Sequence, residues 1–157
     1  MSIINISVVI DAQYVVATFG PNNNSESPPG FYHENIYLTV RGGDAVQSDA
    51  SGWLVMRAKS ESDTDIDRIR WRADDISLGA DHQCRITKLN FQRGANLITA
   101  PKQRRLGRGE NGHRIDCFWE VEVLEPGAVQ YNIEFMVIDG QGRVQGYYTY
   151  DPLIQIS

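Results

Sequence analysis

Alternation of apolar and polar residues constrains the fold of this chain more than any other feature. In its clearest run, from Val129 to Val137 (VQYNIEFMV), every second residue is apolar and the others are polar apart from Met136. Successive side chains of a strand point to opposite sides, so this period of two is typical of a strand with one buried face. Related patterns predict further extended segments at 4–10, 15–19, 36–40, 52–60, 69–73, 115–123 and 144–156.

No window of about a dozen residues shows the 3.6-residue apolar period of an amphipathic helix. Sheets that lack covering helices bury their apolar sides by packing face to face. We therefore predict an all-β fold, a single-domain antiparallel β-sandwich of the jelly-roll or immunoglobulin-like type with about eight strands. The length of 157 residues fits one domain, spanning residues 1–157.

Turn-forming residues divide the strands. The pair Pro126–Gly127 predicts a hairpin between the strands at 115–123 and 129–137, and 139–143 (DGQGR) predicts a second turn. Two longer segments, 20–35 and 95–114, have no clear period and are expected to be irregular. Long loops in a compact domain are often functional.

Composition and termini favour a cytoplasmic protein. The N-terminal residues lack the features of a secretory signal, and no apolar run approaches the roughly 20 residues that span a bilayer. Cys84 and Cys117 are expected to be free, partly buried thiols. The predicted location is the cytoplasm, with inclusion bodies or non-classical release left open and no membrane partner.

Catalytic motifs are absent from the sequence. His33, His82 and His113 lie in predicted loops, and neither a GxSxG nor an HExxH pattern occurs. We therefore predict a non-enzymatic protein.

Basic residues are concentrated in one part of the chain. Residues 85–114 contain eight of the fifteen Lys and Arg residues and one acidic residue, Glu110, while the whole chain has a net charge of −5. This balance disfavours nucleic acid as the main partner. The role of the basic loop at 101–114 stays open, because acidic surface of the same chain or of another subunit could also meet it.

A candidate binding site combines the first long loop with the last strand. Carboxylates and amides bind sugar hydroxyls or calcium, and aromatic rings pack on the apolar side of a sugar. Asp11 and Asp151 could also hold a calcium ion. The candidate ligand-binding residues are Asp11, Asn22, Asn24, His33, Tyr148, Tyr150 and Asp151. Turn capping by Asn and Asp, and packing of tyrosines at strand ends, are the alternative roles.

Two motifs resemble the PixA/AidA family of small bacterial proteins. They are VVIDAQY, from Val8 to Tyr14, and GYYTYDP, from Gly146 to Pro152, and the similarity extends from Ile3 to Ile156. Tyr150 stands where members often have Trp, and the basic loop departs from the family pattern. The resemblance implies a soluble cytoplasmic β-sandwich, produced under population-density control, without an assigned enzymatic activity.

Two functions follow as hypotheses. The first is a lectin-like carbohydrate-binding protein that uses loops at one end of the sandwich, with calcium as an additional ligand, glycans as partners and a homo-oligomeric state. The alternative is an inclusion-body, storage or self-assembling structural protein without a small-molecule ligand.

Overall fold

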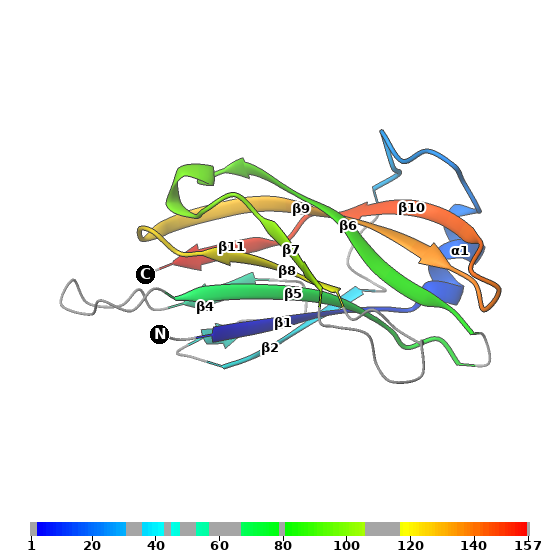
Figure 1. The fold of residues 1–157 in the computed structure, drawn as a ribbon, viewed down its shortest axis with the longest axis horizontal. Coiled ribbons are helices and arrows are strands. Elements are labelled where there is room, and N and C mark those ends of the chain that lie inside the picture. The colour runs from blue at the N-terminus through cyan, green and yellow to red at the C-terminus, as the bar shows by residue number, and fades with distance from the viewer. Residues whose placement is uncertain are drawn as a thin grey trace.

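The structure, a computed structural model, describes residues 3–30, 36–42, 45–47, 53–56, 67–78, 81–105 and 117–156. Strands make up most of these residues and form two sheets that face each other. In Figure 1, β9 and β10 of one sheet run along the top of the molecule, and β1 and β2 of the other run along the bottom. The all-β sandwich predicted from the alternating pattern is confirmed.

The two sheets share no strand. The first sheet contains, in order across it, β2 (Ile36–Arg41), β1 (Ile3–Ile10), β5 (Arg68–Asp75), β8 (Cys117–Glu122) and β7 (Lys102–Arg105). The second contains, in order, β10 (Val144–Tyr150), β9 (Gly127–Ile138), β11 (Leu153–Ile156), β4 (Trp53–Met56) and β3 (Ala45–Gln47), and β6 (Gln83–Arg93) also pairs with β9.

Most strand pairs are antiparallel, as predicted, but β1 pairs with β5 and β11 pairs with β4 in parallel. A parallel neighbour requires the chain to return to the same end of the sheet before pairing. The long stretch between β1 and β5 makes that return.

The hairpin predicted at Pro126–Gly127 is wrong. β8 pairs with β7 in the first sheet, whereas β9 pairs with β6 in the second. The connection from β6 to β7, which includes the short 3₁₀ helix η2 (Ala95–Leu97), crosses between the sheets beside the connection from β8 to β9. The Leu124 amide donates to the Leu97 carbonyl at 2.8 Å and the Thr99 amide to the Glu122 carbonyl at 2.9 Å. β6, η2 and β7 thus form one arm of a long hairpin, and β8 and β9 form the other. Its outer part contributes β7 and β8 to the first sheet, and its inner part contributes β6 and β9 to the second.

A glycine permits the chain to cross from one sheet to the other after β6. Gly94 has a φ of +74°, and a Cβ atom there would lie 2.3 Å from the Ala128 carbonyl oxygen. Only glycine fits so close an approach at positive φ. The segment at 95–114, expected to be irregular, therefore includes η2 and the edge strand β7 in its described part.

Residues 15–19 are not extended as predicted but belong to the helix α1 (Ala12–Phe19). The Asp11 carboxylate caps it by accepting from the Tyr14 amide at 3.1 Å. Ala12 and Val15, three residues apart, are both buried, and Gly20 ends the helix with a φ of 75°. With eight residues, α1 is too short to show its period in a long window.

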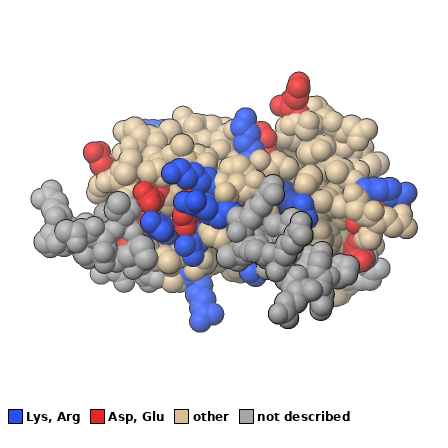
Figure 2. Space-filling model, in the orientation of Figure 1, with Lys and Arg blue, Asp and Glu red and all other residues tan. Residues whose placement is uncertain are grey.

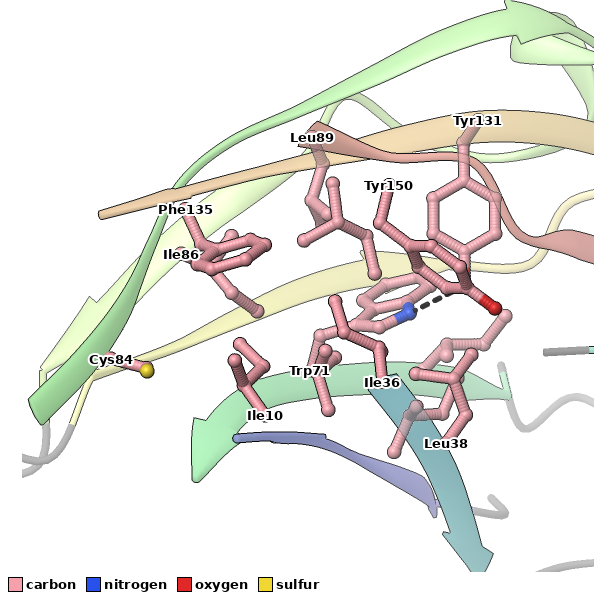
Figure 3. Packing of buried hydrophobic residues seen from close by; sticks show 14 of the residues in the cluster. Ile10, Ile36, Leu38, Trp71, Cys84, Ile86, Leu89, Tyr131, Phe135 and Tyr150 are labelled. Carbon is pink, nitrogen blue, oxygen red and sulfur yellow. Dashed lines mark hydrogen bonds between the residues drawn. The ribbon is translucent and has the colours of Figure 1, made fainter. Parts of the chain in front are cut away.

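The core lies between the sheets and confirms the alternation. Buried side chains come from every second residue of β1 and from most such positions in β9. Trp71 of β5 and Tyr131 of β9 meet at its centre, where the indole Nε1–H donates to the Tyr131 hydroxyl oxygen at 3.0 Å (Figure 3). Both side chains are fully buried.

Candidate functional site

The first long loop closes the outer edge of β10. The Asn22 amide donates to the Gln145 carbonyl at 3.0 Å, and the Thr149 amide donates to the Pro29 carbonyl at 3.1 Å. Between them, the Asn22 side chain donates from Nδ2 to the Tyr147 carbonyl at 3.1 Å, while Oδ1 accepts from the Tyr147 amide at 3.4 Å. A side-chain amide thus replaces the peptide group of a neighbouring strand.

Asn24 shapes the same loop. Its Nδ2 donates to the Ser27 carbonyl at 2.6 Å, and its Oδ1 accepts from the Ser27 amide at 2.9 Å. These are the turn-capping interactions that Asn often makes. The polar groups of Asn22 and Asn24 are therefore engaged within the chain rather than presented to a sugar.

The last strand divides its tyrosines as the alternation predicts, with Tyr147 on one face and Tyr148 and Tyr150 on the other. Tyr148 and Tyr150 face the core, however, with exposed fractions of 0% and 3%. Tyr148 donates its hydroxyl to the Gly20 carbonyl at 2.8 Å, and burial raises its pKa. The stacking role expected of these two rings is contradicted, because their face of β10 packs against the opposite sheet.

Asp11 and Asp151 are not brought together. Asp11 caps α1 at one end of the sandwich, whereas Asp151 is exposed at the junction between β10 and β11, further along the molecule (Figure 1). Pro152 separates the two strands there, so the extended segment predicted at 144–156 is interrupted. No group of three or more His, Cys, Asp or Glu residues that could hold a metal occurs in the described chain. His33 lies outside the described residues.

Exposed apolar side chains gather where α1 lies. Gln13 of α1 donates its amide to the Ser77 hydroxyl at 2.9 Å, which fixes the segment after β5 beside the helix. Leu78 in that segment is 90% exposed. We call this region the α1 end, and its exposed apolar residues are Tyr14, Phe19, Tyr37, Ile76, Leu78 and Val144. Leu124, 55% exposed, belongs to the connection from β8 to β9, which lies at the opposite end of the molecule (Figure 1).

No local pattern in the sequence reveals the α1 end. Tyr37 looks like any residue on the outer face of a strand, and Ile76 and Leu78 stand in the polar context DDISLGA. Their grouping arises because β1, β2, β5 and β10 begin or end at this place in the fold.

Charged side chains form a ladder on the outer face of β5, β8 and β7. Arg70 donates from Nε to Glu120 at 2.7 Å, Arg104 lies 3.5 Å from the same carboxylate, and Arg68 pairs with Glu122 at 3.1 Å. Figure 2 shows Lys and Arg side chains gathered over this region. Burial of Glu120 opposes ionisation, but the hydrogen bond from Arg70 and the nearby positive charges prevail and lower its pKa.

The described basic residues of the segment 85–114 lie on β6 and β7, along one side of the sandwich. β6 is an edge strand of the second sheet and β7 an edge strand of the first, and η2 connects them. We call this side the β6–β7 edge, and its basic residues are Arg85, Lys88, Arg93, Lys102, Arg104 and Arg105. Both cysteines are free, Cys84 buried and Cys117 half-buried, as expected.

Two facing sheets around one core, joined by a folded-over hairpin and accompanied by a short helix, define an all-β sandwich protein. A sequence model of the PixA family, described as inclusion body protein, matches residues 2–156. The chain therefore belongs to the PixA inclusion body protein family, as its two end motifs suggested.

A solved relative has the same fold. The crystal structure of the inclusion body protein PixA from Burkholderia cenocepacia J2315 matches with a TM-score of 0.78 and 14% sequence identity, covering 99% of this chain and 95% of that chain. At that identity the likeness concerns the fold alone. No curated protein matches the chain. In the described residues, no helix is long and apolar enough to cross a membrane.

Proposed function

We propose that this chain is a self-assembling inclusion-body protein whose copies associate through the α1 end. The observation that carries the proposal is the grouping of exposed apolar side chains there, with Leu78 90% exposed. Apolar side chains left exposed in one region of a fold often mark an interaction site, and their burial favours association by about 25 cal/mol per Å². Membership of a family described as inclusion body proteins supports a second copy as the partner.

The proposal makes the chain a structural or storage protein located in the cytoplasm. Packing between copies is enough for it, so it requires neither catalysis nor a bound small molecule. The cytoplasm is the location expected from the sequence, and the family description supports it.

Sedimentation velocity over a range of protein concentrations tests the proposal. We expect reversible, concentration-dependent association that added sugars and the substitution Asp151→Ala leave unchanged. Leu78→Ser should weaken association, because it removes apolar area without adding charge. Leu124→Ser, at the opposite end of the sandwich, is the matched control. A monomer at every concentration would refute the proposal.

Carbohydrate binding has less support. Four of the seven residues expected to hold a sugar, Asp11, Asn22, Asn24 and Tyr148, make hydrogen bonds within the chain. A glycan array at high protein concentration, with and without a chelator, tests this hypothesis directly.

A further inference from the structure

The segment that covers the outer edge of β10 acts as a strap, and we use this name for residues 20–30 (GPNNNSESPPG), drawn in blue in Figure 1. Its backbone and the Asn22 side chain bond the outward backbone groups of every second residue of the strand, Gln145, Tyr147 and Thr149. The strap therefore occupies the positions at which a neighbouring strand would pair.

The strap is weakly anchored. Apart from its prolines it contains no apolar side chain, and residues 23–27 are all exposed. Both bonds to Tyr147 come from the single side chain of Asn22. Segments with few buried apolar contacts open locally at a lower free energy than the strands of a core. We expect the strap to detach from β10 while the sandwich stays folded.

Closure of the strap leaves one polar group unsatisfied. The Thr149 hydroxyl oxygen is buried and finds no hydrogen-bond partner in the described part of the chain. Gly30 forms a bridge with this residue, and a Cβ atom at Gly30 would lie 3.5 Å from Thr149 Cγ2. A buried hydroxyl without a partner is unfavourable. Opening of the strap removes part of this cover and lets water reach the hydroxyl, which offsets part of the free energy of opening.

The covered strand has the composition of a segment that pairs readily. β10 (VQGYYTY) contains Val, Thr and three Tyr residues, and neither a charged residue nor a proline. These residue types favour strands, and short uncharged segments rich in them pair with other chains when they are exposed. Protection of β10 against another chain therefore depends on the strap.

The other edges of the described sheets are protected in different ways. β6 has two register shifts and carries Arg85, Lys88 and Arg93, and β7 is four residues long. Bulges, charged side chains and short strands all discourage pairing with another chain. β2 and β3 contact each other across the two sheets. β10 has one register shift at its beginning, and its pairing with β9 is continuous from Gly146 to Tyr150.

We propose that residues 20–30 form an autoinhibitory strap and that its opening lets β10 pair with β10 of a second copy. This contact goes beyond association through the α1 end and does not depend on it. Because the outward backbone groups are centred on Tyr147, two copies of β10 can pair antiparallel about a two-fold axis at this residue. Tyr147 then lies opposite Tyr147 of the second copy, and the Thr149 amide reaches the Gln145 carbonyl.

A second copy of the chain suits this edge. In the symmetric register, each backbone group that the strap engages finds its complement on the same segment of the other copy. Two Tyr147 rings meet on the outer face of the joined sheet, and aromatic pairs across neighbouring strands are favourable. No like charges are brought together, since β10 carries none. Membership of a family described as inclusion body proteins also supports a second copy as the partner.

Loosening the strap gives the first test. Asn22→Ala should raise the population of the open form about fivefold, because it removes the bonds to Tyr147. Two open copies must meet, so the association constant should rise with the square of that population, by about 25-fold. Sedimentation velocity measures it, with Asn23→Ala as the matched control because Asn23 is exposed. Equal association of the two variants would overturn the proposal.

Amide exchange reports the pairing directly. At concentrations too low for association, the Tyr147 amide of the Asn22→Ala variant should exchange faster than in the unchanged protein. At high concentrations, pairing with a second copy should protect the same amide again. Exchange at Tyr147 that does not change with protein concentration, in a variant that associates, would contradict pairing through β10.

Charge at the two-fold axis gives the decisive test. The strap bonds the backbone of Tyr147, so the side chain can be changed while these bonds remain. In the Asn22→Ala background, Tyr147→Lys and Tyr147→Glu should each lower the association constant at least about threefold, because like charges then lie opposite each other. An equimolar mixture should recover it, and a mixture that fails to do so overturns the proposal. Gln130→Lys and Gln130→Glu are the control pair, because Gln130 is exposed on β9 opposite β11 rather than β10.

A further substitution separates this contact from the α1 end. In the Asn22→Ala background, Leu78→Ser should leave the gain in association unchanged. A gain that Leu78→Ser abolishes belongs to the α1 end, which overturns the strap and leaves the proposed function standing. An unchanged protein that stays monomeric, with the gain and the charge recovery intact, overturns the proposed function alone. Far-ultraviolet circular dichroism verifies that the variants are folded.

Discussion

Trp71 and Tyr131 join the two sheets through one buried hydrogen bond, with the indole Nε1–H 3.0 Å from the Tyr131 hydroxyl oxygen. Their rings also meet edge to face at a centroid distance of 5.6 Å. Burial raises the pKa of Tyr131, so its hydroxyl stays protonated and neutral. The pair satisfies two polar groups in an interior where an unpaired one is costly.

Removing this hydrogen bond should destabilise the fold. Tyr131→Phe keeps the ring but leaves the Trp71 N–H buried without its acceptor, which costs about 1–3 kcal/mol of unfolding free energy. Urea denaturation measures the loss. Tyr147→Phe, on the half-buried face of β10, is the control and should change the unfolding free energy by less than about 0.5 kcal/mol. Equal stability of Tyr131→Phe and the unchanged protein would contradict the role of the bond.

The Asn22 side chain should protect the edge of β10. Asn22→Ala removes its bonds to both backbone groups of Tyr147 and should cost about 1 kcal/mol locally. Hydrogen exchange of the Tyr147 amide should then become about fivefold faster, since exchange reports local opening. Asn23→Ala, its exposed neighbour, should leave that rate unchanged. Equal rates in the two variants would show that the loop closes the edge without Asn22.

Asp11 should contribute to stability as a helix cap. Asp11→Ala removes the acceptor for the Tyr14 amide and should lower the unfolding free energy by about 0.5–2 kcal/mol. Asp11→Asn keeps an acceptor oxygen and should recover most of the loss. Thermal unfolding compares the three proteins, and an Ala variant as stable as the Asn variant would show that the cap contributes nothing.

Glu120 should make part of the stability depend on pH. Its pKa in the folded protein lies below the ordinary value of 4.5, so its ion pairs stabilise the fold fully above about pH 4.5. That contribution is lost as the pH falls through the lowered pKa. Glu120→Gln should therefore be less stable at neutral pH and should approach the stability of the unchanged protein in acid. Urea denaturation from pH 7 to pH 3 follows the difference, and a gap that stays constant would contradict this account.

Some features of the fold follow from the local sequence. Alternation at β1 and β9 identifies their inner faces, because the period of a strand is a local property. The turn at 139–143 is also local: Asp139 accepts from the amides of Gln141 and Arg143, each at 2.9 Å. Asp11 makes the same kind of bond as the cap of α1, but eight residues are too few to reveal this helix by periodicity.

The sequence pattern predicts less of the candidate site than of the strands. The spacing of Tyr148 and Tyr150 places them on one face, but only the opposing sheet decides that this face is the core. Asn22 and Asn24 have the composition of a binding loop, yet the nearby edge of β10 engages the Asn22 side chain. The sequence pattern identifies the candidate aromatic and amide side chains, whereas tertiary packing decides whether they are exposed.

By itself, the sequence determined the strand character, the all-β class, the inner faces of its clearest strands and the concentration of basic residues in one segment. Tertiary structure alone decided that β8 and β9 belong to different sheets, that Tyr148 and Tyr150 face the core, and that exposed apolar side chains meet at the α1 end. The physical reason is the distance along the chain over which the two kinds of interaction act. Alternation and turn chemistry act between residues a few positions apart, while sheet partners and surfaces are set by contacts between residues such as Trp71 and Tyr131, sixty positions apart.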